Sequence, residues 1–248
     1  MRSVLPALAV LLFAGMAAAQ SAHPSPRTFP MTLVRNQCIE FTEVKRGGEP
    51  EDFRDCLVSK FDEFGSVDGQ KYYYALYCLI PNFVPDKGKC GDGSLSAHFY
   101  SQRALAIFTS ASAGGPLRLV FERADGDIGA LFYEPPEIVR TAAGTILCLP
   151  IAVDGTGHGN ASEYYLRERG DWRRIESEAW LKELEQRLPA GLQIWKGVWP
   201  DLRTMQAEAG LYRQGDANCC PTGGVARIQL AIRDGKFVLE PVTFEKAE

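Results

Sequence analysis

Histidine is scarce in this chain of 248 residues, which has only His23, His98 and His158. The cysteines and histidines form no C-x-x-C or H-x-x-x-H spacing, which excludes the common tetrahedral zinc motifs. The sequence also lacks a G-x-S-x-G segment and a phosphate-binding glycine loop, which mark many serine hydrolases and nucleotide-binding proteins. We therefore expect no metal site of these kinds, no cofactor and no catalytic residue that a motif identifies.

Positive charge is not in excess either, because 31 acidic residues outnumber 27 basic ones and give a net charge of −4. A mildly acidic surface offers no support for binding nucleic acids or anionic membranes. After the N-terminal region, no apolar run approaches the roughly 20 residues that cross a bilayer. We expect the partner to be an unknown protein or a small ligand, with no nucleic acid and no membrane insertion.

The N-terminal residues have the features of a secretory signal peptide. Arg2 supplies a short positive region, Val4–Met16 is apolar, and three alanines then provide the small residues that signal peptidase needs. An uncleaved membrane anchor is the alternative, which the short apolar run disfavours. The pattern predicts residues 1–19 as a signal peptide cut after Ala19, a disordered leader at 20–31, and a periplasmic or secreted mature protein.

Beyond residue 31, the hydrophobic pattern predicts an α+β fold, mainly antiparallel β-sheet and stapled by disulfides. Apolar residues at helical spacing predict two main helices, at about residues 50–64 and 177–188. An N-terminal α+β part at 32–114 and a C-terminal β-rich part at 115–248 form either two domains or one continuous domain. No repeat of roughly 20–50 residues indicates a propeller or a solenoid.

Strands are predicted where apolar and polar residues alternate, or where a short apolar run lies between turn residues. Residues 96–111 fit either one long strand or a strand and a short helix. The Arg-Gly-Asp triplet that begins at Arg169 is read as a plain turn rather than an adhesion motif. The other expected strands and hairpins lie at 37–44, 71–81, 117–136 with a turn in ADGDIG, 144–153, 162–176, and a three-stranded meander at 204–213, 225–233 and 236–244.

Aromatic residues cluster in two places and raise the question of a ligand platform. Four tyrosines lie within residues 72–77, and Trp195 and Trp199 flank a turn after the second helix. Large aromatic side chains serve the core more often than a ligand. We therefore expect the tyrosines to fill both faces of a buried strand and the tryptophans to pack against the helix.

Seven cysteines fit an oxidising compartment. A strand–helix bridge between Cys38 and Cys56 and a loop closed by Cys78 and Cys90 are expected, each contributing about 3 kcal/mol. For the other three, two outcomes stay open. Either Cys148 pairs with one member of the adjacent pair Cys219 and Cys220, or these two pair together and Cys148 is a buried thiol.

The adjacent cysteines lie in the segment DANCCPTGG. Neighbouring Cα atoms are about 3.8 Å apart, closer than the usual disulfide range of about 4.4–6.8 Å. A bond between them would close a strained and easily reduced ring, which makes the pair a candidate redox switch. The proline and glycines that follow fit a stapled turn better than an open reactive site.

Residues 154–165 partly match a calcium-binding loop, with Asp154 and Asn160 as weak candidate ligands. Tyr165 stands at the twelfth position, where such a loop needs a bidentate carboxylate. A glycine-rich turn is therefore the preferred interpretation.

The segments LPAGLQIWKGVWPDLRTM and GDANCCPTGG give residues 144–244 a loose similarity to a group of exported bacterial proteins of unassigned function. That resemblance implies no activity and no catalytic residue. We expect a non-catalytic binding or envelope-associated role. One alternative is a secreted hydrolase that uses paired carboxylates, among which Glu134 and Glu137 lie near strand ends. The other is a thiol redox protein that uses Cys219 and Cys220.

Overall fold

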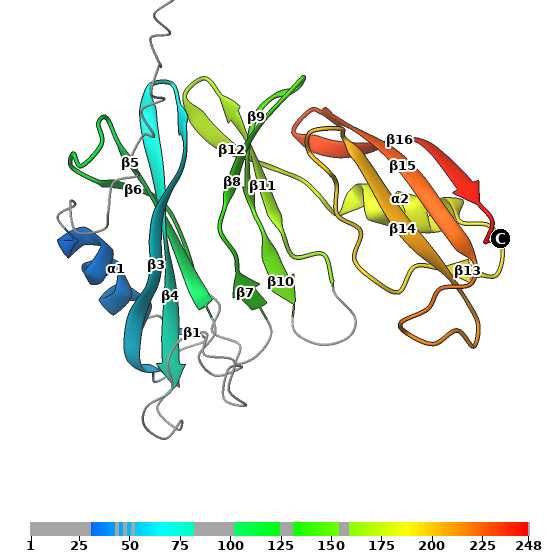
Figure 1. The fold of residues 1–248 in the computed structure, drawn as a ribbon, viewed down its shortest axis with the longest axis horizontal. Helices are drawn as coiled ribbons and strands as arrows, with labels where there is room; N and C mark the ends of the chain where they lie inside the picture. The colour runs from blue at the N-terminus through cyan, green and yellow to red at the C-terminus, as the bar shows by residue number, and fades with distance from the viewer. Residues whose placement is uncertain are drawn as a thin grey trace, which may run out of the picture.

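The computed structural model describes residues 31–42, 45–46, 49–50, 53–81, 102–124, 131–153 and 159–247. Within these ranges the chain forms three four-stranded antiparallel sheets, two helices and two short two-stranded ladders. Figure 1 shows the three sheets side by side, in the order of the sequence. The predicted antiparallel architecture with two helices is confirmed, although the fold is mostly β and the label α+β fits it poorly. The two-residue strands β1 (Lys45–Arg46) and β2 (Glu49–Pro50) form one of the short ladders.

Sheet I is a meander in which each strand pairs with the next one along the chain. Its strands are β3 (Phe53–Val67), β4 (Gln70–Pro81), β5 (Gln102–Ser110) and β6 (Arg118–Ala124). Helix α1 (Thr32–Thr42) covers the face of sheet I that points away from the rest of the molecule (Figure 1). The Cys38–Cys56 disulfide and a hydrogen bond from the Tyr77 hydroxyl to the Val34 carbonyl attach α1 to the sheet.

The helix expected at residues 50–64 is wrong, because this segment is β3. Three β-bulges interrupt its pairing with β4. Each bulge inserts a residue and shifts the alternation of faces, so two side chains three residues apart can share a face. Val58 and Phe61 both pack toward α1, whereas Phe64 and Val67 both pack on the opposite face. The resulting spacing of three imitates the period of a helix.

The strand expected at residues 37–44 is also wrong, because helix α1 includes most of this segment. Among the helix residues whose side chains the structure describes, Val34, Gln37 and Cys38 are buried, and their spacing of three and four residues is helical. The predicted Cys38–Cys56 bridge is confirmed, but the helix carries Cys38 and the strand carries Cys56. The predicted strand is therefore a helix and the predicted helix is a strand, although the disulfide predicted between them is correct.

Sheet II has the order β12-β11-β9-β8 and lies next to sheet I. A second ladder of β7 and β10 continues the β8–β9 hairpin beyond prolines in both strands. The elements are β7 (Leu131–Tyr133), β8 (Glu137–Thr141), β9 (Gly144–Leu149), β10 (Ile151–Val153), β11 (Glu163–Glu168) and β12 (Asp171–Ile175).

Sheet II tests three predictions. The expected central strand at 144–153 is confirmed as β9, with Pro150 separating it from β10. The hairpin that turns at Arg169 and Gly170 is confirmed, and both residues have the positive φ that such a turn requires. The hairpin at 117–136 is wrong, because β6 pairs within sheet I whereas β7 pairs with β10.

Sheet III contains the C-terminal meander that the sequence predicts. Its strands are β13 (Leu192–Gln193), β14 (Gln206–Arg213), β15 (Gly224–Arg233) and β16 (Lys236–Glu245). Helix α2 (Ala179–Arg187) confirms the second expected helix. Its Trp180 and Leu184 are buried among residues of sheets II and III, so the helix fills space between these two sheets.

The cores lie between the layers. Sheets I and II share one apolar cluster, in which Tyr72, Tyr74 and Leu147 are buried. On the other face of β4, Tyr73 and Tyr77 are buried beneath α1. The tyrosine-rich strand therefore fills two cores, as expected, and forms no ligand surface. No helix in the described ranges is long and apolar enough to cross a membrane.

The disulfides fit an extracellular or periplasmic protein, since such bonds persist in oxidising compartments. The signal peptide at 1–19 and its cleavage lie outside the described residues and stay a prediction. His23, His98 and His158 lie outside them as well.

Candidate functional site

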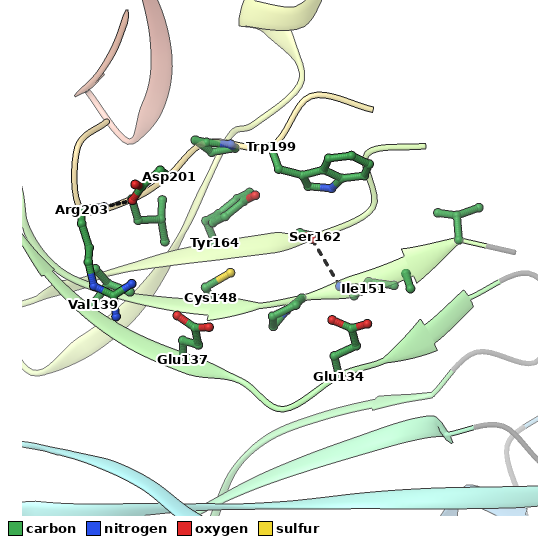
Figure 2. A pocket seen from close by; sticks show the side chains of 15 residues that line it. Glu134, Glu137, Val139, Cys148, Ile151, Ser162, Tyr164, Trp199, Asp201 and Arg203 are labelled. Carbon is green, nitrogen blue, oxygen red and sulfur yellow. Dashed lines mark hydrogen bonds between the residues drawn. The ribbon is translucent and has the colours of Figure 1, made fainter. Parts of the chain in front are cut away.

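A cavity of about 410 Å³ opens between sheet II and the segment that leads into β14. Small-molecule sites commonly have volumes of about 300–1,000 Å³. Figure 2 shows glutamates on the sheet side and a tryptophan, an aspartate and an arginine on the opposite side. The polar and aromatic side chains that line it are Glu134, Glu137, Cys148, Ser162, Tyr164, Trp199, Asp201 and Arg203.

The floor of the cavity is a row of side chains across three strands. Glu137 on β8 is the register partner of Cys148 on β9, and Cys148 is the partner of Tyr164 on β11. Directly paired residues of antiparallel strands point to the same face, so the three side chains lie together. This face of sheet II points toward sheet III, and the next row along it is the apolar trio Val139, Ile146 and Leu166.

Glu134 reaches the same cavity because the strand is interrupted. In a continuous strand, residues three apart point to opposite faces. Pro135 and Pro136 separate β7 from β8, and the Glu134 backbone N–H donates to the Pro150 carbonyl at 3.1 Å. The interruption re-aims the chain, so the side chains of Glu134 and Glu137 both point into the cavity (Figure 2).

Neither glutamate is neutralised by the protein around it. Within the described part of the chain, the structure gives the carboxylates of Glu134 and Glu137 no hydrogen bond and no ion pair, and both residues are exposed. Their hydrogen-bonding capacity is thus available to a ligand. Ser162 differs from them, since its hydroxyl accepts a hydrogen bond from the Ile151 backbone N–H at 3.3 Å.

Cys148 is a free thiol, but it is not an activated one. Burial, with a smaller contribution from the negative charge of Glu137, raises the pKa of Cys148 to about 12. A nucleophilic cysteine needs the opposite shift, toward the thiolate near neutral pH. Burial also raises the pKa of the neighbouring Tyr164 hydroxyl. Both groups remain protonated at neutral pH and can donate hydrogen bonds into the cavity.

Asn160 anchors the opposite wall at Val198. The Asn160 side-chain oxygen accepts from the Val198 backbone N–H at 2.7 Å, and its amide nitrogen donates to the Val198 carbonyl. The Val198 side chain is buried between the sheets, only 2% exposed. The next residue, Trp199, is 44% exposed and lines the cavity. A tryptophan that is largely free of the core is therefore attached to a firmly held backbone.

Asp201 closes the turn that follows Trp199. One of its oxygens accepts from the backbone N–H groups of Arg203 and Thr204, and these hydrogen bonds lower the pKa of Asp201. The aspartate therefore stays charged at neutral pH. Among the described residues that line the cavity, Arg203 is the single basic side chain, against the carboxylates of Glu134, Glu137 and Asp201. These four side chains together carry a net negative charge.

Trp199 departs from the expectation that both tryptophans pack against the helix, whereas Trp195 lines a small cavity together with Leu181 and Leu184 of α2. Trp199 projects into the cavity instead of the core. Trp195 is 37% exposed and stacks on Tyr212, with ring centroids 4.5 Å apart. Since α2 fills the space next to sheet III with Trp180 and Leu184, the two later tryptophans are left near the surface.

The weak calcium candidates are not brought together by the described residues. The side-chain oxygen of Asn160 is already engaged by the Val198 backbone, and Asp154 lies outside the described ranges. Among the residues that the structure places, no group of three or more His, Cys, Asp or Glu side chains is arranged to hold a metal ion.

Cys219 and Cys220 pair with each other, and Cys148 is unpaired, which settles the two outcomes left open by the sequence. Cys78 is also disulfide-bonded, whereas its expected partner Cys90 lies outside the described residues. The loop around the vicinal pair is held by Asp216, whose carboxylate accepts from the Arg213 and Thr222 backbone N–H groups. The vicinal disulfide does not line the cavity.

The sequence alone does not predict either side of this cavity. It marks Glu134 and Glu137 only as acidic residues near strand ends, and it predicts that Trp199 packs against the helix. Two signals were available. The segment Glu-Pro-Pro-Glu interrupts a strand between two acids, and Trp-Pro-Asp places an aromatic residue immediately before a turn.

Comparisons with known proteins leave the family of this chain open. No protein-family model matches, and no curated protein is significantly similar. Among solved structures, a thermostable family-43 glycoside hydrolase aligns over 83% of this chain and 62% of its own length, with 12% identity and a TM-score of 0.30. A family-43 β-1,3-galactosidase solved with galactodeoxynojirimycin aligns over 84% of this chain and 81% of its own, with 11% identity and a TM-score of 0.24.

A family-43 protein from Bacillus licheniformis aligns over 72% of this chain and 42% of its own length, with 14% identity and a TM-score of 0.26. This chain therefore spans about three fifths of the first of these structures and about two fifths of the third. TM-scores this low do not establish a shared fold.

Proposed function

We propose that this protein binds a carbohydrate in the cavity between sheet II and the Trp199 segment. The observation that carries the proposal is a solvent-accessible tryptophan on a fixed backbone, facing two unpaired glutamates. A sugar ring presents a C–H face that can pack on an indole, and hydroxyl groups that donate to carboxylates. The cavity offers both kinds of contact at once.

The charge of the cavity narrows the class of sugar. Three carboxylates against one guanidinium favour neutral or positively charged rings over uronic acids. The protonated Tyr164 and Cys148 add donors for ring or hydroxyl oxygens. A neutral sugar and an amino sugar therefore fit this site, and an acidic one does not.

The proposal is tested by calorimetric titration with three oligosaccharide series of equal length. N-acetylglucosamine oligomers are neutral, glucosamine oligomers are cationic and galacturonate oligomers are anionic. We expect binding of the neutral or cationic series and none of the anionic one. Trp199→Ala and Glu137→Gln should each weaken binding about tenfold, the loss expected for one aromatic contact or one charge-assisted hydrogen bond.

Trp195→Ala is the matched control, because Trp195 is similarly exposed but lies outside the cavity. This variant should bind like the unmodified protein. Equal losses in Trp195→Ala and Trp199→Ala would contradict the proposal, and so would tight binding of the galacturonate series alone.

Hydrolysis of a glycosidic bond is the second candidate, favoured by one observation: Glu134 and Glu137 line the same cavity and have no protein partner in the described ranges. Glycosidases commonly use two such carboxyl groups. Burial is what usually keeps one of these groups protonated, and both glutamates are exposed. Binding is therefore preferred. Release of reducing sugar that disappears in both Glu134→Gln and Glu137→Gln would reverse this preference.

A further inference from the structure

A second cavity, of about 540 Å³, lies against sheet III and shares two residues with the first one. Trp199 and Asp201 line both. The tryptophan therefore forms the boundary between the two cavities. A ligand that packs on the indole in the first cavity can extend directly into the second one. We call this second cavity the sheet III groove.

The sheet III groove is polar because it lies on the outward face of the meander. Buried residues of β14 and β15 alternate with partly or fully exposed ones, and this second set points away from sheet II. Glu208 is the register partner of Arg227, which is the partner of Thr243. Gln206 and Gln229 form the adjacent row and hydrogen-bond at 3.3 Å.

Several of these side chains are fixed by hydrogen bonds before any ligand arrives. Arg227 contacts Glu208 at 2.9 Å and Glu245 at 2.6 Å. The amide nitrogen of Gln229 donates to the Met205 carbonyl at 2.9 Å, which leaves its oxygen to accept from Gln206. Polar groups held in place lose little conformational entropy when they bind a ligand.

Unused hydrogen-bonding capacity remains at the surface of the groove. The side-chain oxygen of Gln206 and the hydroxyl of Thr243 have no partner within the described residues, and both residues are exposed. An acceptor and a donor–acceptor group of this kind suit the hydroxyl groups of a sugar. The groove thus repeats the chemistry of the first cavity without its unpaired carboxylates.

We infer that the ligand is an oligosaccharide that runs from the first cavity, across the indole of Trp199, into the sheet III groove. This inference rests on the proposed carbohydrate binding. It adds that the site has two subsites and that the affinity depends on chain length. The continuity of the two cavities at Trp199 and Asp201 carries it.

The test is a length series. The N-acetylglucosamine and glucosamine oligomers from one to six units are titrated into the unmodified protein and into a Gln206→Ala/Thr243→Ala double variant. We expect the affinity of the unmodified protein to rise at least tenfold from the shortest ligand that binds to the hexamer. The double variant should lose most of this gain while binding the shortest ligand within twofold of the unmodified protein.

Gln214→Ala is the matched control, because Gln214 is exposed in a turn and lines neither cavity. It should keep the full length dependence. An affinity that does not rise with length overturns the two-subsite inference and leaves the carbohydrate site in the first cavity intact. Equal losses at every length in the double variant would also overturn it, and no binding at any length would overturn both proposals.

Discussion

The two faces of sheet II are built from alternate residues of the same strands, yet one face is packed into a core and the other lines a cavity. Toward sheet I, Leu147 and Leu149 of β9 are completely buried in an apolar cluster. Toward sheet III, their neighbour Cys148 lines a cavity together with Glu137 and Tyr164. The first face is packed along its length, whereas the second is packed at Val139, Ile146 and Tyr164 and opens at Glu137, where the cavity begins.

The difference shows how a small β protein can separate stability from binding. A strand that supplies one face to a core is held rigidly in place, so its other face can present polar groups without losing order. Glu137 and Leu147 belong to adjacent positions of the β8–β9 ladder, and the core behind them fixes both. We therefore expect substitutions on the two faces to affect different measurements.

Replacing Leu147 should have the largest effect on stability. Leu147→Ala leaves a void in a fully buried position, and such changes typically cost about 2–5 kcal/mol of unfolding free energy. Chemical denaturation at neutral pH measures this loss. The folded fraction should still bind the oligosaccharide with unchanged affinity, because Leu147 does not line the cavity.

Cys148→Ala is the control from the opposite face. It removes a single sulfur atom next to an open cavity, so the stability should change by no more than about 1 kcal/mol. If Cys148→Ala destabilises the protein as much as Leu147→Ala does, the second face is part of the core and the contrast between the faces is wrong.

The parts of the fold that the sequence predicts are those whose signals lie within one short segment. The hairpin at Arg169 and Gly170 and the meander of sheet III follow from local signals, since a turn residue and regular alternation lie side by side in the chain. Helix α2 is similar, with Trp180 and Leu184 on one face. Each of these turn, strand and helix signals is contained in a segment of about ten residues.

The elements that were mistaken depend on partners far along the chain. The bulges of β3 exist only in its pairing with β4, and they allow Val58 and Phe61, three residues apart, to share a face as they would on a helix. For α1, packing on sheet I and the bridge from Cys38 to Cys56 stabilise a segment whose own pattern also fits a strand. Local propensity was outweighed by tertiary contacts in both cases.

The candidate site is less predictable than the fold because no single segment carries it. Glu137, Cys148 and Tyr164 meet through strand register, and Trp199 arrives from a segment that the Asn160 side chain holds from the other side of the cavity. The sequence gives the positions of these residues along the chain but not the distances between their side chains in the fold. Glu-Pro-Pro-Glu, a break in a strand between two acids, and Trp-Pro-Asp, an aromatic residue before a turn, are the two local hints.

Removing the support of Trp199 should have the second largest effect. Asn160→Ala leaves the backbone N–H and carbonyl of Val198 without their side-chain partner, which should cost about 1–3 kcal/mol of unfolding free energy. Because Trp199 would then be less restrained, oligosaccharide affinity should fall about tenfold. Fluorescence anisotropy of the indoles and calorimetric titration measure the two consequences.

Asn160→Asp is a second variant, since it keeps the oxygen that accepts from Val198 but replaces the donated bond with repulsion between a carboxylate oxygen and the Val198 carbonyl. Its affinity should fall at least as far as that of Asn160→Ala. Full affinity in Asn160→Ala would show that Trp199 needs no positioning by this residue.

Alkaline pH should weaken the protein through groups on both faces. Burial raises the pKa of Cys148 to about 12, whereas an unfolded thiol ionises near pH 8.5. Between these values the unfolded chain has lost a proton that the native protein retains, so the unfolding free energy falls as pH rises, by up to about 1.4 kcal/mol per pH unit for one group.

Denaturation between pH 8 and pH 11 measures this slope. Cys148→Ala should show a shallower decline than the unmodified protein, while the buried Tyr165, whose pKa is raised to about 12 chiefly by burial, continues to contribute from the other face. Identical slopes in the two proteins would mean that the Cys148 thiol ionises equally well in the native state.

The smallest effect is expected from removing the charge beside Cys148. Alkylation by iodoacetamide requires the thiolate, so with a pKa of about 12 Cys148 should react on the order of a thousandfold more slowly at pH 8 than a cysteine in the denatured chain. Glu137 is the second cause of this raised pKa, after burial. Glu137→Gln should therefore accelerate alkylation only a few-fold, as mass spectrometry of the modified thiol can record.

Glu168→Gln, on the same sheet but outside the cavity, is the control and should leave the rate unchanged. A bound oligosaccharide should slow the alkylation of Cys148 further, because it covers the floor of the cavity, where Cys148 lies. If saturating ligand leaves the alkylation rate of Cys148 unaltered, the sugar binds elsewhere, and the face of sheet II that opens toward sheet III is not the binding face.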